Sequence, residues 1–148
     1  MVPKQNRYNR INLDGKSRNY TTTSLVALKG GQVVCLDATD KAVLATAALV
    51  NAGNHLYAVI AQTLGVGEDI PAGDSLTLDY METGREFALY TPAGTVLTRD
   101  KMLTIKDGVV ALAAAAADET PADRVVAFSV EKYTVAAGKQ ELVRVRIA

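Results

Sequence analysis

Cys35 and His55 are the residues of this 148-residue chain best suited to nucleophilic catalysis, which requires a nucleophile beside a base. Cys35 lies inside the apolar run "QVVCLD", where a small buried thiol is typical. His55, the single histidine, lies in the polar loop "NAGNH" without clustered metal ligands, and the chain has no G-x-S-x-G turn. We therefore expect a structural cysteine, a surface histidine and no enzymatic activity. A small hydrolase using this pair is an alternative.

Two further motifs could bind a cation or a phosphate. Glu68, Asp69 and Asp74 surround the turn in "GEDIPAGD", but they lack the alternate-position spacing of an EF-hand loop. The segments "GVGED" and "KGGQ" are rich in glycine, but they lack the Lys-Ser/Thr pair and the following helix of a phosphate-binding loop. The sequence therefore predicts no metal and no cofactor.

The strongest local feature is the charge of the N-terminus. Residues 1–20 contain five basic residues and one acidic residue, a formal charge of +4, which leaves −4 for residues 21–148 because the whole chain is neutral. Residues 1–24 show neither helical nor alternating apolar periodicity, so we expect an extended basic arm that is mobile when free and ordered only against a partner. The residues expected to contact that partner are Arg7, Tyr8, Arg10, Ile11, Leu13, Lys16, Arg18 and Tyr20.

Basic residues interleaved with tyrosines could contact either an acidic protein surface or a nucleic acid. The negative body carries no basic stripe, which favours a protein target and leaves nucleic-acid binding as an alternative. There is no signal-peptide pattern, and apolar runs such as "AVLATAALV" are too short to span a bilayer. A lone cysteine excludes an intramolecular disulfide. We expect a soluble, non-secreted protein that assembles in a reducing cytoplasm.

The arm with its contact residues must be attached to a folded body, which we expect to span residues 25–148. Four glycine turns, at Gly31, Gly73, Gly94 and Gly138, each precede a β-like run. In one run Leu76 and Leu78 alternate with polar residues, which predicts one buried and one solvated face. We expect a mainly β body, either a small barrel or a sandwich.

The spacing of the turns indicates an internal duplication. Gly31 and Gly94 are 63 residues apart and Gly73 and Gly138 are 65 apart, whereas the two distances within the halves are 42 and 44. We therefore expect two approximate repeats, about 28–80 and 90–148.

Helical content is expected to be small. Asp40 could cap a short helix that runs through Val50 and ends at Asn51 and Gly53. The segment "ALAAAAADE" has high helix propensity until Pro121, although alanine-rich segments also occur as strands or crossover loops. We expect at most one or two short helices.

Residues 26–148 resemble the decoration or cement proteins of tailed-bacteriophage heads. The resemblance lies in the order of "GGQVV", "YAVIAQTL", "IPAGDSLTL", "AGTVLTRD", "DGVVALA" and "VAAGKQELVRVRI". It implies a β-barrel or β-tulip body that binds the major capsid protein, as a trimer, on the outside of an expanded capsid. The basic arm is longer than the polar leaders frequent in that family.

The expected function is therefore capsid stabilisation, with assembly in the host cytoplasm and final localisation on the virion. A tail-associated or receptor-binding β module is the alternative. Such a module would need exposed aromatic residues to bind carbohydrate, and the chain has no Trp and two Phe.

Overall fold

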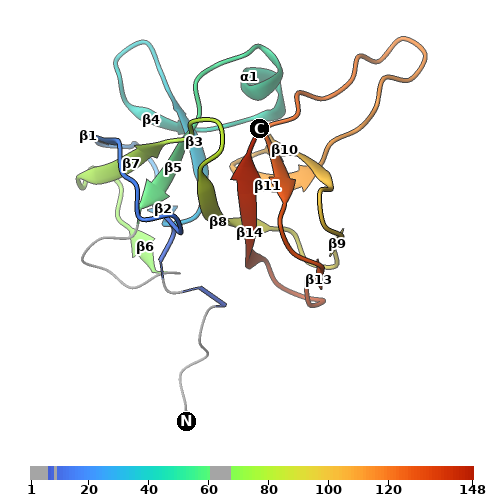
Figure 1. The fold of residues 1–148 in the computed structure, drawn as a ribbon. Coiled ribbons are helices and arrows are strands. Elements are labelled where there is room, and N and C mark those ends of the chain that lie inside the picture. Colours follow the sequence, from blue (N-terminus) through green and yellow to red (C-terminus); the bar gives the residue numbers. More distant parts are fainter. Residues whose placement is uncertain (1–6, 9, 61–67) are drawn as a thin grey trace.

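A computed structural model describes residues 7, 8, 10–60 and 68–148 and shows a mainly β protein, as expected (Figure 1). The described part contains fourteen strands and one short helix. In chain order the elements are β1 (Asn19–Thr22), β2 (Leu28–Lys29), β3 (Val33–Leu36), β4 (Ala42–Leu44), α1 (Ala47–Asn51), β5 (Tyr57–Ile60), β6 (Asp69–Ile70), β7 (Leu76–Tyr80), β8 (Glu86–Thr91), β9 (Val96–Leu97), β10 (Met102–Lys106), β11 (Val109–Leu112), β12 (Ala127–Ser129), β13 (Tyr133–Thr134) and β14 (Glu141–Ile147).

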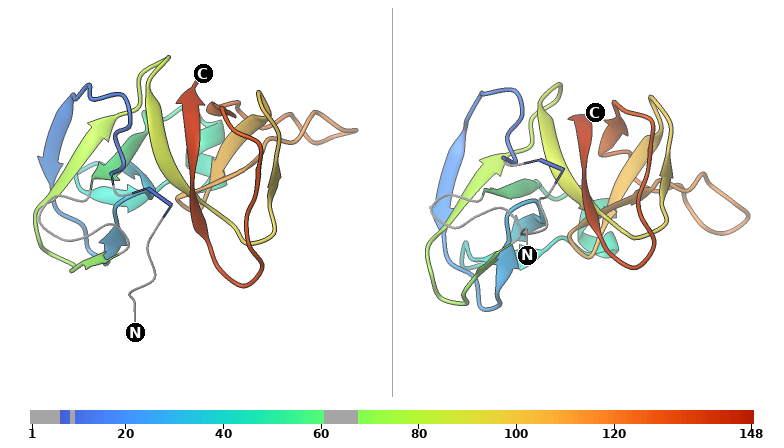
Figure 2. Two further views of the ribbon diagram at one scale, coloured as in Figure 1. Left: turned by 60° about the horizontal axis from the view of Figure 1, so that its bottom comes forward. Right: turned by 90° about the horizontal axis from the view of Figure 1, so that it is seen from below.

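The strands before and after the β7–β8 connection pair by the same scheme. The first half forms a five-stranded sheet in the order β1-β7-β5-β3-β4 and a two-stranded sheet of β2 and β6. In the second half the order is β8-β14-β12-β10-β11, and β9 pairs with β13. All these pairs are antiparallel, and each half occupies its own side of the molecule (Figures 1 and 2).

This strand pairing changes one of the correspondences expected between the repeats. Gly73 and Gly138 precede β7 and β14, which hold equivalent places in the two sheets. Gly31 precedes β3, whereas Gly94 precedes β9, whose equivalent in the first half is β2. The matched pair of Gly31 and Gly94 is therefore wrong as a structural equivalence, because similar turns introduce different strands.

In the described part of the chain, the core consists of two clusters that share the first sheet. β3 is buried on both faces, since Val33 and Cys35 belong to the larger cluster while Val34 belongs to the smaller one. The larger cluster also contains the buried side chains of β8 and β14, so it joins the two halves. Cys35 is thus a buried core residue, as expected, and burial raises the pKa of its thiol.

The single described helix is shorter than the helix expected from Asp40 to Val50. Thr46 is its N-cap, with Oγ1 accepting a hydrogen bond from Leu49 N, and Gly53 follows its end with φ of +86°. Asp40 instead adopts φ of +60° in the turn between β3 and β4. The expected capping role of Asp40 is therefore wrong, because strand pairing keeps residues 42–44 extended.

The alanine-rich segment after β11 is not helical. Residues 114–122 are exposed in a loop that projects from the body (Figure 1), and Ala117 and Thr120 form an isolated bridge within it. Helix propensity alone does not stabilise a short helix without an apolar face to bury, so the loop conformation prevails. No helix in the part of the chain described is long and apolar enough to cross a membrane.

Replacing Gly31 with alanine is expected to lower the free energy of unfolding by about 2–3 kcal/mol, measured by urea denaturation. Gly31 has φ of +100°, which is unfavourable for a residue with a side chain. A Cβ atom there would also lie 2.7 Å from Leu142 Cδ2 and 3.2 Å from Tyr90 Cδ2. The substitution therefore adds overlap in the core to backbone strain.

Gly94 provides the matched control for this substitution. Its φ is +78°, but no atom outside Gly94 and its two neighbours in the chain lies within 4 Å of the position of an added Cβ atom. Gly94→Ala is therefore expected to cost only the backbone term, about 1 kcal/mol. Equal losses in the two variants would show that packing around Gly31 contributes nothing.

Candidate interaction surface

The N-terminal segment from residue 10 to residue 24 is part of the folded body. Ile11 is buried in the larger core cluster, and its carbonyl accepts a hydrogen bond of 2.8 Å from Ala88 N. β1 pairs with β7 along its whole length. The prediction of an arm that extends to Ser24 and orders only against a partner is therefore wrong for residues 10–24. Residues 1–6 and 9 of the expected arm lie outside the described residues.

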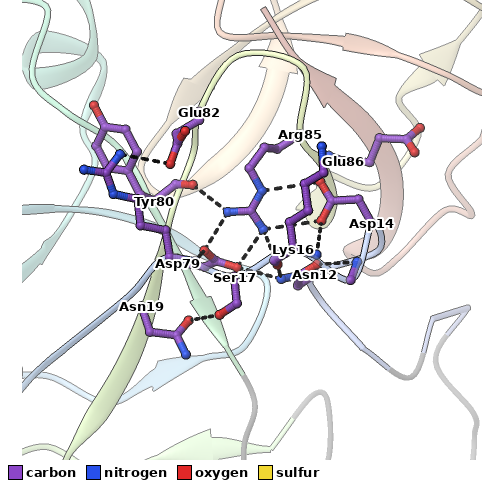
Figure 3. A network of polar contacts seen from close by, with 12 residues as sticks. Asn12, Asp14, Lys16, Ser17, Asn19, Asp79, Tyr80, Glu82, Arg85 and Glu86 are labelled. Carbon is purple, nitrogen blue, oxygen red and sulfur yellow. Dashed lines mark hydrogen bonds and ion pairs between the residues drawn. The ribbon is translucent and has the colours of Figure 1, made fainter.

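A buried ion pair anchors this segment between the two halves (Figure 3). Asp79 on β7 is 0% exposed, and its two carboxylate oxygens accept hydrogen bonds from Arg85 Nη1 and Nη2 at 2.7 and 2.9 Å. Asn12 Nδ2 and Arg18 N donate to the same carboxylate at 2.8 and 2.9 Å. The carboxylate is therefore satisfied by four donors, as a buried charge requires.

Asp14 completes the anchor from the segment itself. It accepts hydrogen bonds from Arg85 Nε at 3.3 Å and from the backbone N–H groups of Glu86 and Lys16. Burial opposes ionisation of Asp14, but these donors outweigh burial and hold the pKa of its carboxyl below the ordinary value. The hydrogen bond to Asp79 is the main reason that the pKa of Arg85 is raised. This network holds the segment on the body.

No sequence pattern indicated that Asp79 would be buried. Strict alternation with Leu76 and Leu78 placed Asp79 and Thr77 on a solvated face. In the structure both are buried, and Asn12 and Arg18 of the N-terminal segment donate hydrogen bonds to the Asp79 carboxylate. The expectation of a solvated face is therefore wrong for β7, whereas Arg144 and Arg146 on β14 are exposed.

Arg7 and Tyr8 already have partners within the chain. Arg7 makes two hydrogen bonds to Glu131, at 2.8 and 3.0 Å, and its guanidinium carbon lies 3.4 Å from the centre of the Tyr133 ring. The Tyr8 hydroxyl donates to Glu131 Oε2 at 3.1 Å. Of these three expected contact residues, Ile11 is buried and Tyr8 is half-buried, whereas Arg7 is exposed although it is paired with Glu131.

Lowering the pH from about 5 to about 3 is expected to reduce the urea midpoint progressively. Burial of Glu131 opposes ionisation, but the hydrogen bonds from Arg7, Arg144 N and Tyr8 leave the pKa of its carboxyl lowered, as for Asp14. A lowered folded-state pKa stabilises the fold fully above the unfolded-state pKa of about 4. That stabilisation disappears as the pH falls through the folded-state pKa. Glu131→Gln should flatten the dependence, and an unchanged slope in this variant would contradict the assignment.

Besides Arg7, which is paired with Glu131, four of the expected contact residues are exposed, and two further exposed residues follow them in the chain. Arg10, Lys16, Arg18 and Tyr20 are exposed, whereas Leu13 is half-buried. Leu25 and Val26, in the loop that leaves β1, are 81% and 51% exposed. The sequence contained one signal for the exposure of this pair: Leu25 and Val26 are adjacent aliphatic residues that belong to no alternating run. We call the following set the N-terminal surface: Arg10, Lys16, Arg18, Tyr20, Leu25 and Val26.

The described residues that were considered for catalysis and metal binding do not come together as a catalytic or a metal-binding site. Cys35 lies in the core, whereas His55 is exposed with Nδ1 2.7 Å from the Tyr80 hydroxyl. Asp69 is 3.9 Å from Lys29 Nζ in an exposed ion pair. Within residues 7, 8, 10–60 and 68–148, no three acidic, histidine or cysteine side chains form a group that could hold a metal ion.

No protein-family model matches the chain, and no match was found among curated proteins.

Proposed function

We propose that this protein is a structural virion protein that binds the outer surface of an expanded bacteriophage capsid and stabilises it. In this proposal the partner is the major capsid protein, and the protein binds as a homo-oligomer, with the trimer implied by the family resemblance. The N-terminal surface supplies the contact, and no catalytic step is involved.

The observation that supports this proposal most is the fixed position of the N-terminal surface. Lys16 and Arg18 belong to the segment that the buried pair of Asp79 and Arg85 holds on the body. A surface that is already ordered loses less conformational entropy on binding than a free arm would. Weak contacts repeated at many copies on a shell can then act together.

The composition of the N-terminal surface suits an acidic protein target. Arg10, Lys16 and Arg18 are cationic, whereas Leu25 and Val26 offer exposed apolar area. Opposite charges accelerate association and orient the partners, while apolar burial supplies affinity. Binding should therefore weaken, but not vanish, when salt screens the charges.

The experiment combines the purified protein with expanded shells that lack it, followed by imaging of the added density and thermal melting of the shells. Saturable density at symmetry-related positions and a higher melting temperature are the expected results. Absence of saturable binding would refute the proposal and favour the tail-associated module.

Charge reversal tests the surface without unfolding the protein. Deletion of residues 1–20 is unsuitable because it removes Ile11 from the core and half of β1. Arg10→Glu with Lys16→Glu should reduce shell occupancy at least tenfold at low salt. Arg99→Glu with Lys101→Glu changes the same charge at exposed positions in the second half and should leave occupancy unchanged. Equal loss in both pairs would show a net-charge effect instead of a specific surface.

A further inference from the structure

Three of the six tyrosines meet at one end of the first sheet, although they come from three separate strands. Tyr20 on β1, Tyr57 on β5 and Tyr80 on β7 lie on adjacent strands in the order β1-β7-β5. The ring centres of Tyr57 and Tyr80 are 5.4 Å apart in an edge arrangement, and those of Tyr20 and Tyr57 are 6.3 Å apart. His55 lies beside them, with its ring centre 5.6 Å from that of Tyr80.

These rings line a hollow of about 300 Å³ together with Arg18, Asn19 and His55. A second hollow of about 550 Å³ adjoins it, since His55 and Tyr80 line both. Tyr20 is 38% exposed at the rim, whereas Tyr57 packs against the smaller core cluster. The hollow is therefore open to solvent but has a floor fixed by packed strands, which favours a preorganised binding site.

The charges around this hollow are balanced. Among the described residues of the lining, Arg18 is the one cationic side chain, and its Nη1 lies 3.2 Å from Glu82 Oε1 of the adjoining hollow. The Arg18 guanidinium also lies 5.4 Å from the centre of the Tyr80 ring. Because Arg18 already faces an anion and a ring, the hollow has no excess charge to select a phosphate or an ammonium group.

We propose that this hollow binds a neutral saccharide. A pyranose ring has apolar C–H faces that pack on aromatic rings, and hydroxyl groups around its edge that need donors and acceptors. Tyr20, Tyr57 and Tyr80 supply the rings, while Asn19, His55 and the tyrosine hydroxyls supply polar partners at the rim. The sugar would enter with one face against the tyrosines and its hydroxyl edge toward Arg18 and His55.

The proposed saccharide site contains residues that the N-terminal surface lacks, so the two sites can be tested separately. Tyr57 and His55 are absent from the N-terminal surface, whereas Arg18 and Tyr20 belong to both. Tyr57→Leu removes a ring but retains apolar bulk against the core cluster, so the fold should persist. Tyr57→Leu should therefore reduce saccharide binding and leave shell occupancy unchanged.

The experiment is an NMR titration of the full chain with neutral oligosaccharides of glucose, galactose and N-acetylglucosamine. We expect saturable shifts of the ring resonances of the three tyrosines with at least one of these sugars, and about tenfold weaker binding by Tyr57→Leu. His55→Ser, at an exposed position, is a second variant and should also weaken binding. Met102→Ser removes an exposed apolar residue from the second half and should change nothing.

Other probes decide between ligand classes. Tetramethylammonium, inorganic phosphate and a short oligothymidylate should give no saturable shifts of the three tyrosines. A response to one of these probes without a response to sugars, or no response to any sugar at high millimolar concentration, would overturn the proposal. If a sugar binds, intact lipopolysaccharide and its released polysaccharide, compared with sugar-free lipid vesicles, identify whether the source is a cell surface or a free glycan.

Discussion

Replacing Asp79 with alanine is expected to lower the free energy of unfolding by about 3–5 kcal/mol in urea denaturation. The substitution leaves the buried guanidinium of Arg85 without its two shortest carboxylate contacts. It also removes the acceptor for Asn12 Nδ2 and Arg18 N. The loss is large because a buried donor or charge that loses its partner retains the full cost of its removal from water.

An exposed ion pair in the same region provides the control. Glu82 pairs with Arg18 at 3.2 Å, but the side chains are 40% and 72% exposed, so Glu82→Ala should cost less than about 1 kcal/mol. The combined replacement of Asp79 by leucine and Arg85 by methionine should recover part of the stability lost in Asp79→Ala, because the buried guanidinium is removed together with its main partner. The recovery should be incomplete because Asp14 then keeps only its backbone donors, the N–H groups of Glu86 and Lys16. Equal destabilisation by Asp79→Ala and Glu82→Ala would contradict the structural role assigned to the buried pair.

The same substitution links the anchor to the proposed function. Asp79→Ala should free the segment that carries Lys16 and Arg18, so shell binding should weaken even at temperatures where the variant remains folded. Near-native shell binding by a folded Asp79→Ala variant would show that preorganisation of the N-terminal surface is unimportant.

Replacing Phe87 with alanine is expected to cost about 3–5 kcal/mol. Phe87 on β8 is 0% exposed and belongs to the core cluster that joins the two halves. Deleting its ring loses the favourable free energy of burying the ring away from water. It also leaves a cavity between the sheets that cannot close without moving β8. The guanidinium of Arg85 lies 4.9 Å from the ring centre, so the effect should also be coupled to that of the buried ion pair.

The second phenylalanine of the chain is the matched control for Phe87. Phe128 on β12 is half-buried and lies beside the Arg146 guanidinium, 5.8 Å from the ring centre. Phe128→Ala removes the same atoms and should cost less than half as much, because part of the ring is in water in the folded state. A larger loss at Phe128 than at Phe87 would place the main stabilising contacts in the second sheet instead of between the halves.

The N-terminal segment shows where a sequence pattern is ambiguous. Few aliphatic residues and many basic ones suggested an arm, yet the segment lies on the body through buried Ile11, the pairing of β1 with β7 and the ion pair of Asp79 with Arg85. The hydrogen bonds of Asn12 to Asp79 and of Asp14 to Arg85 span 67 and 71 residues. A periodicity window of ten to twenty residues contains no information about such pairs.

The tyrosine cluster also depends on contacts between residues that are far apart in the sequence. Tyr20 and Tyr57 come from separate runs and meet because β7 lies between β1 and β5. Counting aromatic residues in the chain argued against a carbohydrate-binding face, whereas strand order brings three of the six tyrosines together. The order of strands in a sheet therefore determined this candidate site.

By itself the sequence determined the mainly β class, the strands that follow the glycine turns, the buried thiol of Cys35 and the small helical content. These features depend on side-chain alternation and on backbone preferences of neighbouring residues, which are local properties. Only the tertiary structure decided that Asp79 is buried, that residues 10–24 belong to the body and which basic residues remain exposed. Those outcomes depend on which distant segment covers each face of a sheet. The free energy that favours one such arrangement comes from contacts spread over the whole fold.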